Sequence, residues 1–364
     1  MQRFVTTSAI LDQELSEIRL LVERQTGVVL DCPNGALADH VTSFIEARKL
    51  ESTASLLERL RSTDLDPAAL PSLLEGVIKT ESGFFRHSGA LNALARQVLP
   101  QLYSRRSADP APIRMWSAGC GTGEETYSIA IAVCDAVNPA NVSTPMVGAG
   151  PSGGKSKSLG RSGGPAEVLP NSPASPAKLN PSCAVHIVGS DLLPQSIACA
   201  DRGMYPQSAI DGLPPAIIRN YFSKIGSPAG ASNPANGKLP QDIRQISEDG
   251  ETAGEVRSTP AASAHLLVKP RLRSLVTFNC MNLARPGYIG RFDCIFCMDV
   301  LPHFSRAQRL ATLERLHLYL EPGGYLFLSQ TEKLSAPNLN FRSETFDGYT
   351  FHRKPMAASA AYGR

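Results

Sequence analysis

The sequence predicts an α/β protein in which an open, doubly wound sheet follows a small helical domain. Two observations carry this prediction. Apolar residues recur at helical spacing within 1–78, whereas short apolar runs bounded by Gly, Asp or Asn alternate with helical patterns from Ile113 onward. We therefore expect a helical domain over 1–78, a sheet domain over 79–354 and a flexible tail over 355–364.

Four helices are expected in the first domain. In the first, Leu11, Leu15, Ile18 and Val22 share one face, and Gly27 supplies a stop. Pro71 opens the fourth, since proline is favoured in the first turn of a helix. The apolar residues of the second and third helices are Leu37, Val41, Phe44 and Ile45, then Leu56, Leu57 and Leu60.

Seven strands are expected in the second domain, a number that suits an open doubly wound sheet. Their ranges are 113–117, 185–189, 275–279, 292–297, 325–329, 341–346 and 349–353. Residues 139–182 and 226–263 interrupt the pattern, because they are dominated by Pro, Gly, Ser, Ala and Asn and hold almost no large apolar residues. We expect both to be disordered surface insertions.

Composition excludes several classes of protein. The 36 basic and 33 acidic residues give a net charge of +3 without any basic run, so nucleic acid and membrane surfaces are not expected partners. The eight cysteines are too sparse for a disulfide framework. With neither a signal peptide nor a stretch long enough to span a bilayer, the expected location is the cytoplasm, and we expect a monomer.

A glycine-rich turn joins the first expected strand to a helix. Gly119, Gly121 and Gly123 permit positive φ and let the backbone approach a ligand closely, while the following helix presents its N-terminus. Alone, a G-x-G-x-G loop is as compatible with a tight turn as with a cofactor site.

An acid at the end of the next strand strengthens the nucleotide interpretation. Asp191 lies 68 residues after Gly123, and 44 of these belong to the insertion at 139–182. The remaining 24 match the spacing of about 20 that places a carboxylate beside ribose hydroxyls. The alternative for Asp191 is a cap on the turn that follows it.

Two glutamates after the loop bear on the kind of ligand. Glu124 and Glu125 would repel a pyrophosphate, so a cationic ligand without phosphate, such as S-adenosylmethionine, is favoured. We expect Glu124 to bind its amino group or adenosine. For Glu125 we favour the alternative role of stabilising the helix N-terminus.

The string W-S-A-G-C-x-T-G-E-E-x-Y-S-I-A over 116–130 resembles the cofactor loop of the chemotaxis protein methyltransferases of the CheR type. T-E-S-G-F-F-R over 80–86 is similar to that family's N-x-T-x-F-F-R segment, and the segments G-S-D-L at 189–192, M-N-L-A at 281–284 and F-D-C-I-F-C at 292–297 are similar to its later strand ends. The resemblance covers nearly the whole chain apart from the insertions and the tail.

The resemblance implies a class I (Rossmann-like) S-adenosylmethionine methyltransferase sheet, a small β-subdomain between Tyr221 and Phe278, and S-adenosyl-L-methionine as cofactor. It implies methyl transfer to glutamate carboxylates of a signalling receptor, which would be the protein partner. The cofactor-binding residues that we expect, from the resemblance and the loop, are Thr80, Ser82, Arg86, Ala118, Gly119, Glu124, Asp191, Asn282, Leu283 and Asp299.

Three residues after the fourth strand depart from the family's R-N-V-x-I-Y-F, namely Met298, Asp299 and His303. We expect Arg86 to orient the cofactor or acceptor carboxylate and His303 to line the acceptor channel, so these two are the candidate catalytic residues. The alternatives are a surface arginine and a packed histidine. The departures also keep open a different acceptor, or an inactive cofactor-binding scaffold.

No metal site is expected. Cys294 and Cys297 resemble a zinc or redox pair, but residues three apart on a strand point to opposite faces, and no second pair lies at zinc spacing.

Overall fold

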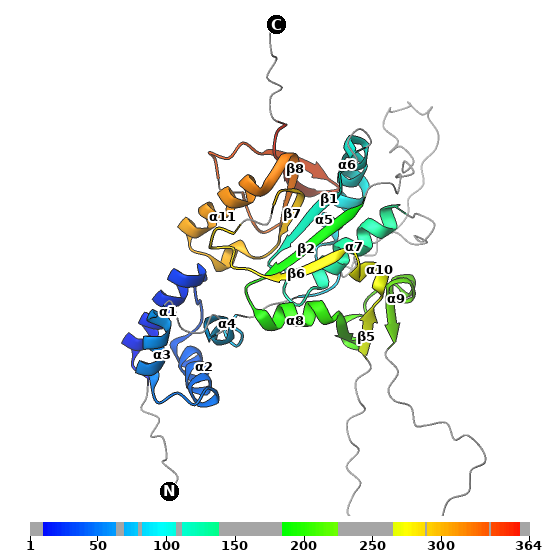
Figure 1. Ribbon diagram of the computed structural model, residues 1–364. Coiled ribbons are helices and arrows are strands. Elements are labelled where there is room, and N and C mark those ends of the chain that lie inside the picture. The colour runs from blue at the N-terminus through cyan, green and yellow to red at the C-terminus, as the bar shows by residue number, and fades with distance from the viewer. Residues whose placement is uncertain are drawn as a thin grey trace, which may run out of the picture.

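A computed structural model of the protein describes residues 10–62, 69–78, 82–106, 111–137, 184–224, 265–287, 290–334 and 336–356 (Figure 1). The two predicted insertions lie outside the described residues, as do Thr80 and the part of the tail beyond Met356.

Four helices form the N-terminal part, as predicted: α1 (Asp12–Thr26), α2 (Asn34–Ala47), α3 (Thr53–Arg61) and α4 (Ala69–Leu74). Gly27 ends α1 in the left-handed conformation, with φ of 76°. Two details differ from expectation. Leu11 is the N-cap residue of α1 and is 65% exposed, so it does not belong to the buried face of the helix. Helix α4 begins at Ala69, two residues before Pro71.

The central sheet has seven strands in the order β6-β2-β1-β7-β8-β10-β9, so the predicted doubly wound sheet is confirmed. Strands β1, β2, β6, β7 and β8 pair in parallel, and β10 pairs antiparallel with both β8 and β9. The strands are β1 (Ile113–Ala118), β2 (Val185–Asp191), β6 (Val276–Cys280), β7 (Phe292–Cys297), β8 (Leu320–Leu328), β9 (Arg342–Phe346) and β10 (Tyr349–Arg353).

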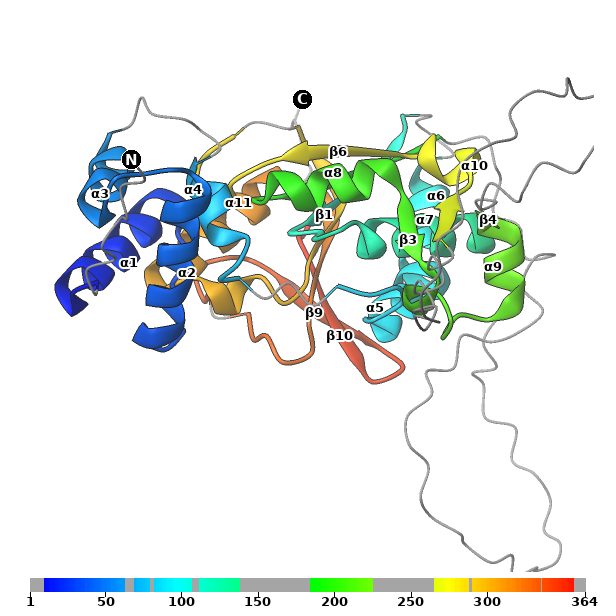
Figure 2. The ribbon, with the colours of Figure 1, turned by 90° about the horizontal axis from the view of Figure 1, so that it is seen from below.

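Helices connect and cover these strands. A continuous helical segment precedes β1, composed of α5 (Ser88–Ala93), the π-helical turn η1 (Leu94–Val98) and α6 (Leu99–Arg106). Figure 2 shows α8 running alongside β6. The later helices are α7 (Glu124–Val137), α8 (Pro194–Arg202), η3 (Gln207–Ala209), α9 (Pro215–Tyr221), α10 (Pro270–Arg273), η4 (Leu301–His303) and α11 (Arg306–Tyr319).

Alternating residues of each parallel strand feed two hydrophobic cores, one on each face of the sheet. Met115 and Cys294 belong to the core formed with α5, α6 and α7, whereas Trp116 and Cys297 belong to the core formed with α11. The two cysteines thus lie on opposite faces, as predicted.

The N-terminal helices share the second core with the sheet. Their buried residues form one continuous cluster with Trp116 and with residues of α11. The backbone contributes as well, because Val28 forms a β-bridge with Phe304 and the Val29 N–H donates to the His303 carbonyl. The helical part is therefore held against the sheet domain by packing and hydrogen bonds together.

A second sheet of three short antiparallel strands has the order β3-β5-β4. Its strands are β3 (Met204–Pro206), β4 (Phe222–Lys224) and β5 (His265–Val268). Strands β4 and β5 fall between Tyr221 and Phe278, where the resemblance places a small β-subdomain. Figure 2 shows this sheet and the N-terminal helices at opposite ends of the molecule.

Candidate functional site

A cavity of about 340 Å³ opens at the carboxyl ends of the parallel strands. This is where ligands bind in doubly wound sheets, and the volume falls in the range of small-molecule pockets. Its walls come from the segment before α5, the loop after β1 and the ends of β2, β6 and β7. Eight predicted site residues line it: Ser82, Arg86, Gly119, Asp191, Asn282, Leu283, Asp299 and His303.

The glycine loop folds tightly against its neighbours. Gly119, Gly121 and Gly123 have φ of 83°, 54° and 97°, values that disfavour other residues. A Cβ on Gly119 would lie 2.3 Å from Val300 Cγ2, and one on Gly123 would lie 2.6 Å from the Cβ of Ala200. The loop thus needs glycine both for conformation and for space.

Asp191 stands at the end of β2 and lines the cavity. Its carboxylate accepts hydrogen bonds from the N–H groups of Gly121 at 3.0 Å and Leu193 at 2.9 Å. Burial raises the pKa of Asp191, against the lowering effect of these bonds. The same carboxylate therefore caps the following turn and fixes the glycine loop, and its remaining lone pairs can serve a ligand hydroxyl.

The two glutamates of α7 lie differently from expectation. Glu124 does not line the cavity; its carboxylate accepts hydrogen bonds from the hydroxyls of Ser82 and Thr122, both at 2.6 Å. Glu125 does line it, and accepts a bond from the Ser117 hydroxyl at 2.7 Å. Glu124 thus ties the 82–86 segment to the loop, while Glu125 presents its charge to the cavity.

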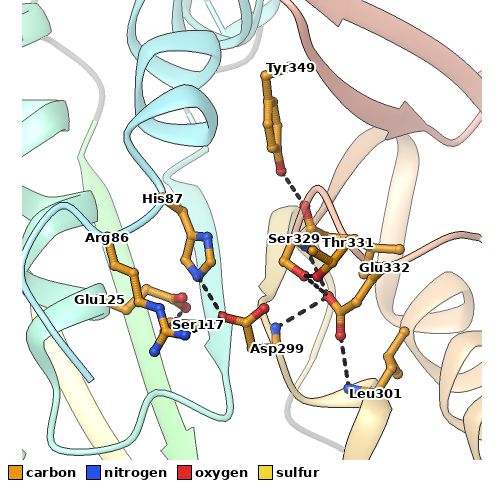
Figure 3. Close-up of polar contacts among 11 residues, drawn as sticks. Arg86, His87, Ser117, Glu125, Asp299, Leu301, Ser329, Thr331, Glu332 and Tyr349 are labelled. Carbon is orange, nitrogen blue, oxygen red and sulfur yellow. Dashed lines mark hydrogen bonds and ion pairs between the residues drawn. The ribbon is translucent and has the colours of Figure 1, made fainter. Parts of the chain in front are cut away.

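Arg86 and its neighbour His87 face Asp299 across the cavity (Figure 3). Asp299 Oδ2 lies 3.3 Å from Arg86 Nη2 and 3.1 Å from His87 Nε2. Burial lowers the pKa of His87, and the carboxylate of Asp299 opposes that effect. Arg86 and Asp299, predicted separately from two distant segments, form one ion pair, with His87 as a third member.

Glu332 stabilises the backbone around Asp299 through hydrogen bonds. Its carboxylate accepts hydrogen bonds from the N–H groups of Asp299, Leu301 and Ser329 and from the Ser329 hydroxyl, at 2.9–3.2 Å (Figure 3). Burial raises the pKa of Glu332 despite these bonds. They hold the turn after β7, in which Asp299 takes a positive φ of 57°.

Asn282 and His303 lie where the N-terminal helices meet the cavity. The Asn282 amide donates to the Gln25 carbonyl at 2.9 Å and accepts from the Ala284 N–H at 2.8 Å. His303 is exposed, and its carbonyl accepts from Val29. Both residues thus line the cavity and also join the helical part to the sheet.

Of the other predicted site residues, Ala118 ends β1 and is buried without lining the cavity, and Thr80 lies outside the described residues. Three residues that line or support the cavity, His87, Glu125 and Glu332, were not predicted in these roles. His87 and Glu125 each adjoin a predicted residue, which is a usable signal. Glu332 has none, since it is 33 residues beyond Asp299.

Among the described residues, no group of three or more His, Cys, Asp or Glu side chains is arranged to hold a metal ion. Within the same residues, no helix has both the length and the apolar character needed to cross a bilayer.

The cavity fits S-adenosylmethionine. Its positive-φ glycines allow close approach of the ligand, Asp191 can accept from ribose hydroxyls, and Arg86 can face a carboxylate. Glu125, Asp191 and Asp299 make the walls acidic, which suits a sulfonium and opposes a pyrophosphate.

Comparisons with known proteins agree with this assignment. The family model "CheR methyltransferase, SAM binding domain" matches residues 80–149 and 243–349. "Chemotaxis protein methyltransferase 1" of Pseudomonas aeruginosa is 25% identical over 90% of this chain and 92% of its own length. The protein of that name from Vibrio cholerae is 26% identical over 91% and 93%, and "Chemotaxis protein methyltransferase Cher2" of Pseudomonas putida is 23% identical over 88% and 90%.

The match covers the glycine loop, the 82–87 segment and the ends of β6 and β7, which form much of the cavity wall, whereas Asp191 at the end of β2 lies outside the matched residues. The sheet order, with an antiparallel β9-β10 hairpin at one edge, is that of the predicted class I methyltransferase fold. The domain that carries this cavity belongs to the CheR methyltransferase family, and the protein is an S-adenosylmethionine-dependent methyltransferase.

Proposed function

We propose that the protein transfers a methyl group from S-adenosylmethionine to glutamate side chains of a chemotaxis receptor, giving glutamate methyl esters. Two relatives named chemotaxis protein methyltransferase 1, from Pseudomonas aeruginosa and Vibrio cholerae, align with it over about nine tenths of both chains. The observation that carries the proposal is the cavity itself, which joins a glycine loop and Asp191 on one side to the cationic Arg86 on the other.

The reaction requires little proton transfer by the protein. A glutamate side chain is ionised at neutral pH, so its carboxylate oxygen can attack a methyl carbon without a general base. When bound, S-adenosylmethionine supplies that electrophilic methyl group, and its carbon–sulfur bond breaks as the ester bond forms. Orientation of the two reactants is the main contribution expected of the site.

Arg86 and His87 are the groups suited to orient a carboxylate, because both direct N–H groups into the cavity region that Asp299 also faces. Asp299 holds the guanidinium in place. His303, exposed at the cavity wall, is placed to contact an incoming receptor segment. These roles agree with the two predictions made from the sequence. Arg86 was expected to orient the cofactor or acceptor carboxylate, and His303 was expected to line the acceptor channel.

Mass spectrometry of a receptor cytoplasmic fragment incubated with protein and cofactor tests this proposal. The expected product gains one CH2 unit, about 14 Da, per modified glutamate, and mild alkali should remove it as it removes other esters. A fragment in which the modified glutamates are replaced by alanine is the control. If cofactor turnover occurs but no alkali-labile methyl group appears on any receptor fragment, the glutamate assignment is wrong.

One observation favours a different acceptor, or loss of catalysis, as the second candidate. The carboxylate of Asp299 already neutralises Arg86, the group best suited to a glutamate. Restoring the family pattern with Met298→Arg, Asp299→Asn and His303→Tyr separates these cases. A scaffold should gain turnover at similar cofactor affinity, whereas an enzyme should already turn over without the substitutions.

A further inference from the structure

Among the described acids that line the cavity, Glu125 is stabilised neither by backbone N–H groups, as Asp191 is, nor by an ion pair, as Asp299 is. Asp191 is bonded to Gly121 and Leu193, and Asp299 is paired with Arg86 and His87. Within the described residues, the carboxylate of Glu125 accepts one hydrogen bond, from the Ser117 hydroxyl, although Glu125 lines the cavity from the first turn of α7.

Several charged and titratable groups act on Glu125. Arg86 attracts its carboxylate, and Asp299 and Glu332 repel it. Cys120, Cys297 and Tyr349 also interact with it electrostatically, but burial raises the pKa of each, so all three stay neutral near pH 7. The cavity therefore holds more negative than positive groups. Among its carboxylates, Glu125 is the one whose negative charge is least compensated by hydrogen-bond donors and cations.

We propose that Glu125 is a specificity-determining residue, whose carboxylate favours the positively charged sulfonium of S-adenosylmethionine over the neutral thioether of S-adenosylhomocysteine. The two ligands share their adenosine, amino and carboxyl groups and differ by one methyl group and one positive charge. A carboxylate on the wall of an acidic, partly enclosed cavity responds to that charge far more than to the methyl group. Glu125 thus aids cofactor binding and product release together.

The charge state of Glu125 supplies a signature that packing alone would not produce. Burial and the carboxylates of Asp299 and Glu332 raise its pKa to about 7, while the Ser117 hydroxyl and Arg86 oppose that rise. Glu125 is therefore neutral below about pH 7 and charged above it. The preference for the sulfonium should increase as the pH rises through this value, accompanied by proton release on cofactor binding.

Isothermal titration calorimetry with S-adenosylmethionine and S-adenosylhomocysteine between pH 6 and pH 8.5 tests the proposal. In the native protein, the ratio of the two dissociation constants should shift toward S-adenosylmethionine by about tenfold over this range. Repeating the titration at pH 7 in buffers of different ionisation enthalpy should show release of about half a proton with the sulfonium only. In Glu125→Gln the ratio should stay flat.

Ser117→Ala is the matched variant, because it keeps the charge and removes only the hydrogen bond that stabilises it. Its midpoint should move to higher pH. If Glu125→Gln binds neither ligand, Ser117→Ala still tests whether Glu125 is the titrating group. A shift in this variant would also exclude Asp191 and Glu332 as the titrating groups, because neither is bonded to Ser117. A pH-independent ratio in the native protein, or an unmoved midpoint in Ser117→Ala, would overturn the proposal.

The inference rests on the cofactor and is independent of the acceptor. If receptor glutamates prove not to be methylated, the binding ratio still tests Glu125. If the ratio is insensitive to pH, the receptor assay still tests the proposed function.

Discussion

At the scale of single residues, Asp299 organises the cationic side of the cavity. Its φ of 57° lies in the left-handed region, where Asn and Asp are the side chains most readily tolerated apart from glycine. The family's usual Asn suits that backbone equally well. The exchange to Asp in this chain therefore changes the charge that Arg86 and His87 face and leaves the backbone requirement satisfied.

Asp299→Asn should lower the pKa of His87 further, because the carboxylate that favours the protonated imidazole is lost. The fold should be retained, since Asn accepts the same backbone conformation. An NMR titration of the histidine ring protons measures this. His352, whose pKa is lowered by burial alone, is the internal reference and should not change. An unchanged His87 titration would contradict the contact with Asp299.

At the scale of elements, the β1-loop-α7 unit is a rigid part of the cavity wall. The N–H groups of Gly119 and Cys120 both donate to the Ser190 carbonyl, which anchors the loop to the end of β2. Phe85, which also has positive φ, donates its N–H to Ser128 on α7. One strand end and one helix thus fix the two segments between which a cofactor would lie.

Gly119→Ala should weaken cofactor binding and lower the melting temperature. The new Cβ would meet Val300 at 2.3 Å, and the positive φ adds about 1–3 kcal/mol of strain. Calorimetric binding and thermal unfolding measure the two effects. Gly212→Ala is the control, because no heavy atom lies within 4 Å of its Cβ, and its effect should stay within about 0.5 kcal/mol. Equal effects in the two variants would refute the steric argument.

At the scale of the whole molecule, the site depends on three layers, namely the central sheet and the helices packed on each of its two faces. The N-terminal helices and the α11 face share a core, and the opposite face has its own. Bonds from Asn282 to Gln25 and from Val29 to His303 then couple the helical part to the cavity wall. A carboxylate buried in such an arrangement makes the stability of the protein depend on pH.

The free energy of unfolding should fall as pH rises from about 5 to 8, in part because of Glu125. Its pKa is raised from 4.5 to about 7 in the folded state, so its stabilising contribution is complete below about pH 4.5 and is lost as pH rises through 7. Glu125→Gln should remove the part of this dependence that Glu125 contributes. The loss is on the order of 1–3 kcal/mol, and each kcal/mol is worth about 2–4 °C.

Thermal unfolding of both proteins at several pH values measures this difference. The melting temperature of Glu125→Gln minus that of the native protein should increase steadily between pH 5 and pH 8. A difference that does not vary with pH would show that Glu125 has an ordinary pKa in the folded protein.

The seven strands, the glycine turn and the acid after β2 could be predicted from the sequence alone. These depend on local patterns, namely alternation within a strand, glycine spacing and the distance from Gly123 to Asp191 once the insertion is removed. The three-stranded sheet was only partly predictable, because strands of three or four residues, such as β3 and β5, are too short to show a clear period.

Which side chains meet at the cavity became clear from the three-dimensional structure. Glu124 and Glu125 are adjacent on α7, and the direction of each is set by the angle at which the helix leaves the loop and by its partners Ser82 and Ser117. Glu332 reaches the site because β7 and β8 pair in parallel, which brings both of their carboxyl ends to the cavity. Such contacts arise from long-range packing, and no local pattern in the sequence encodes them.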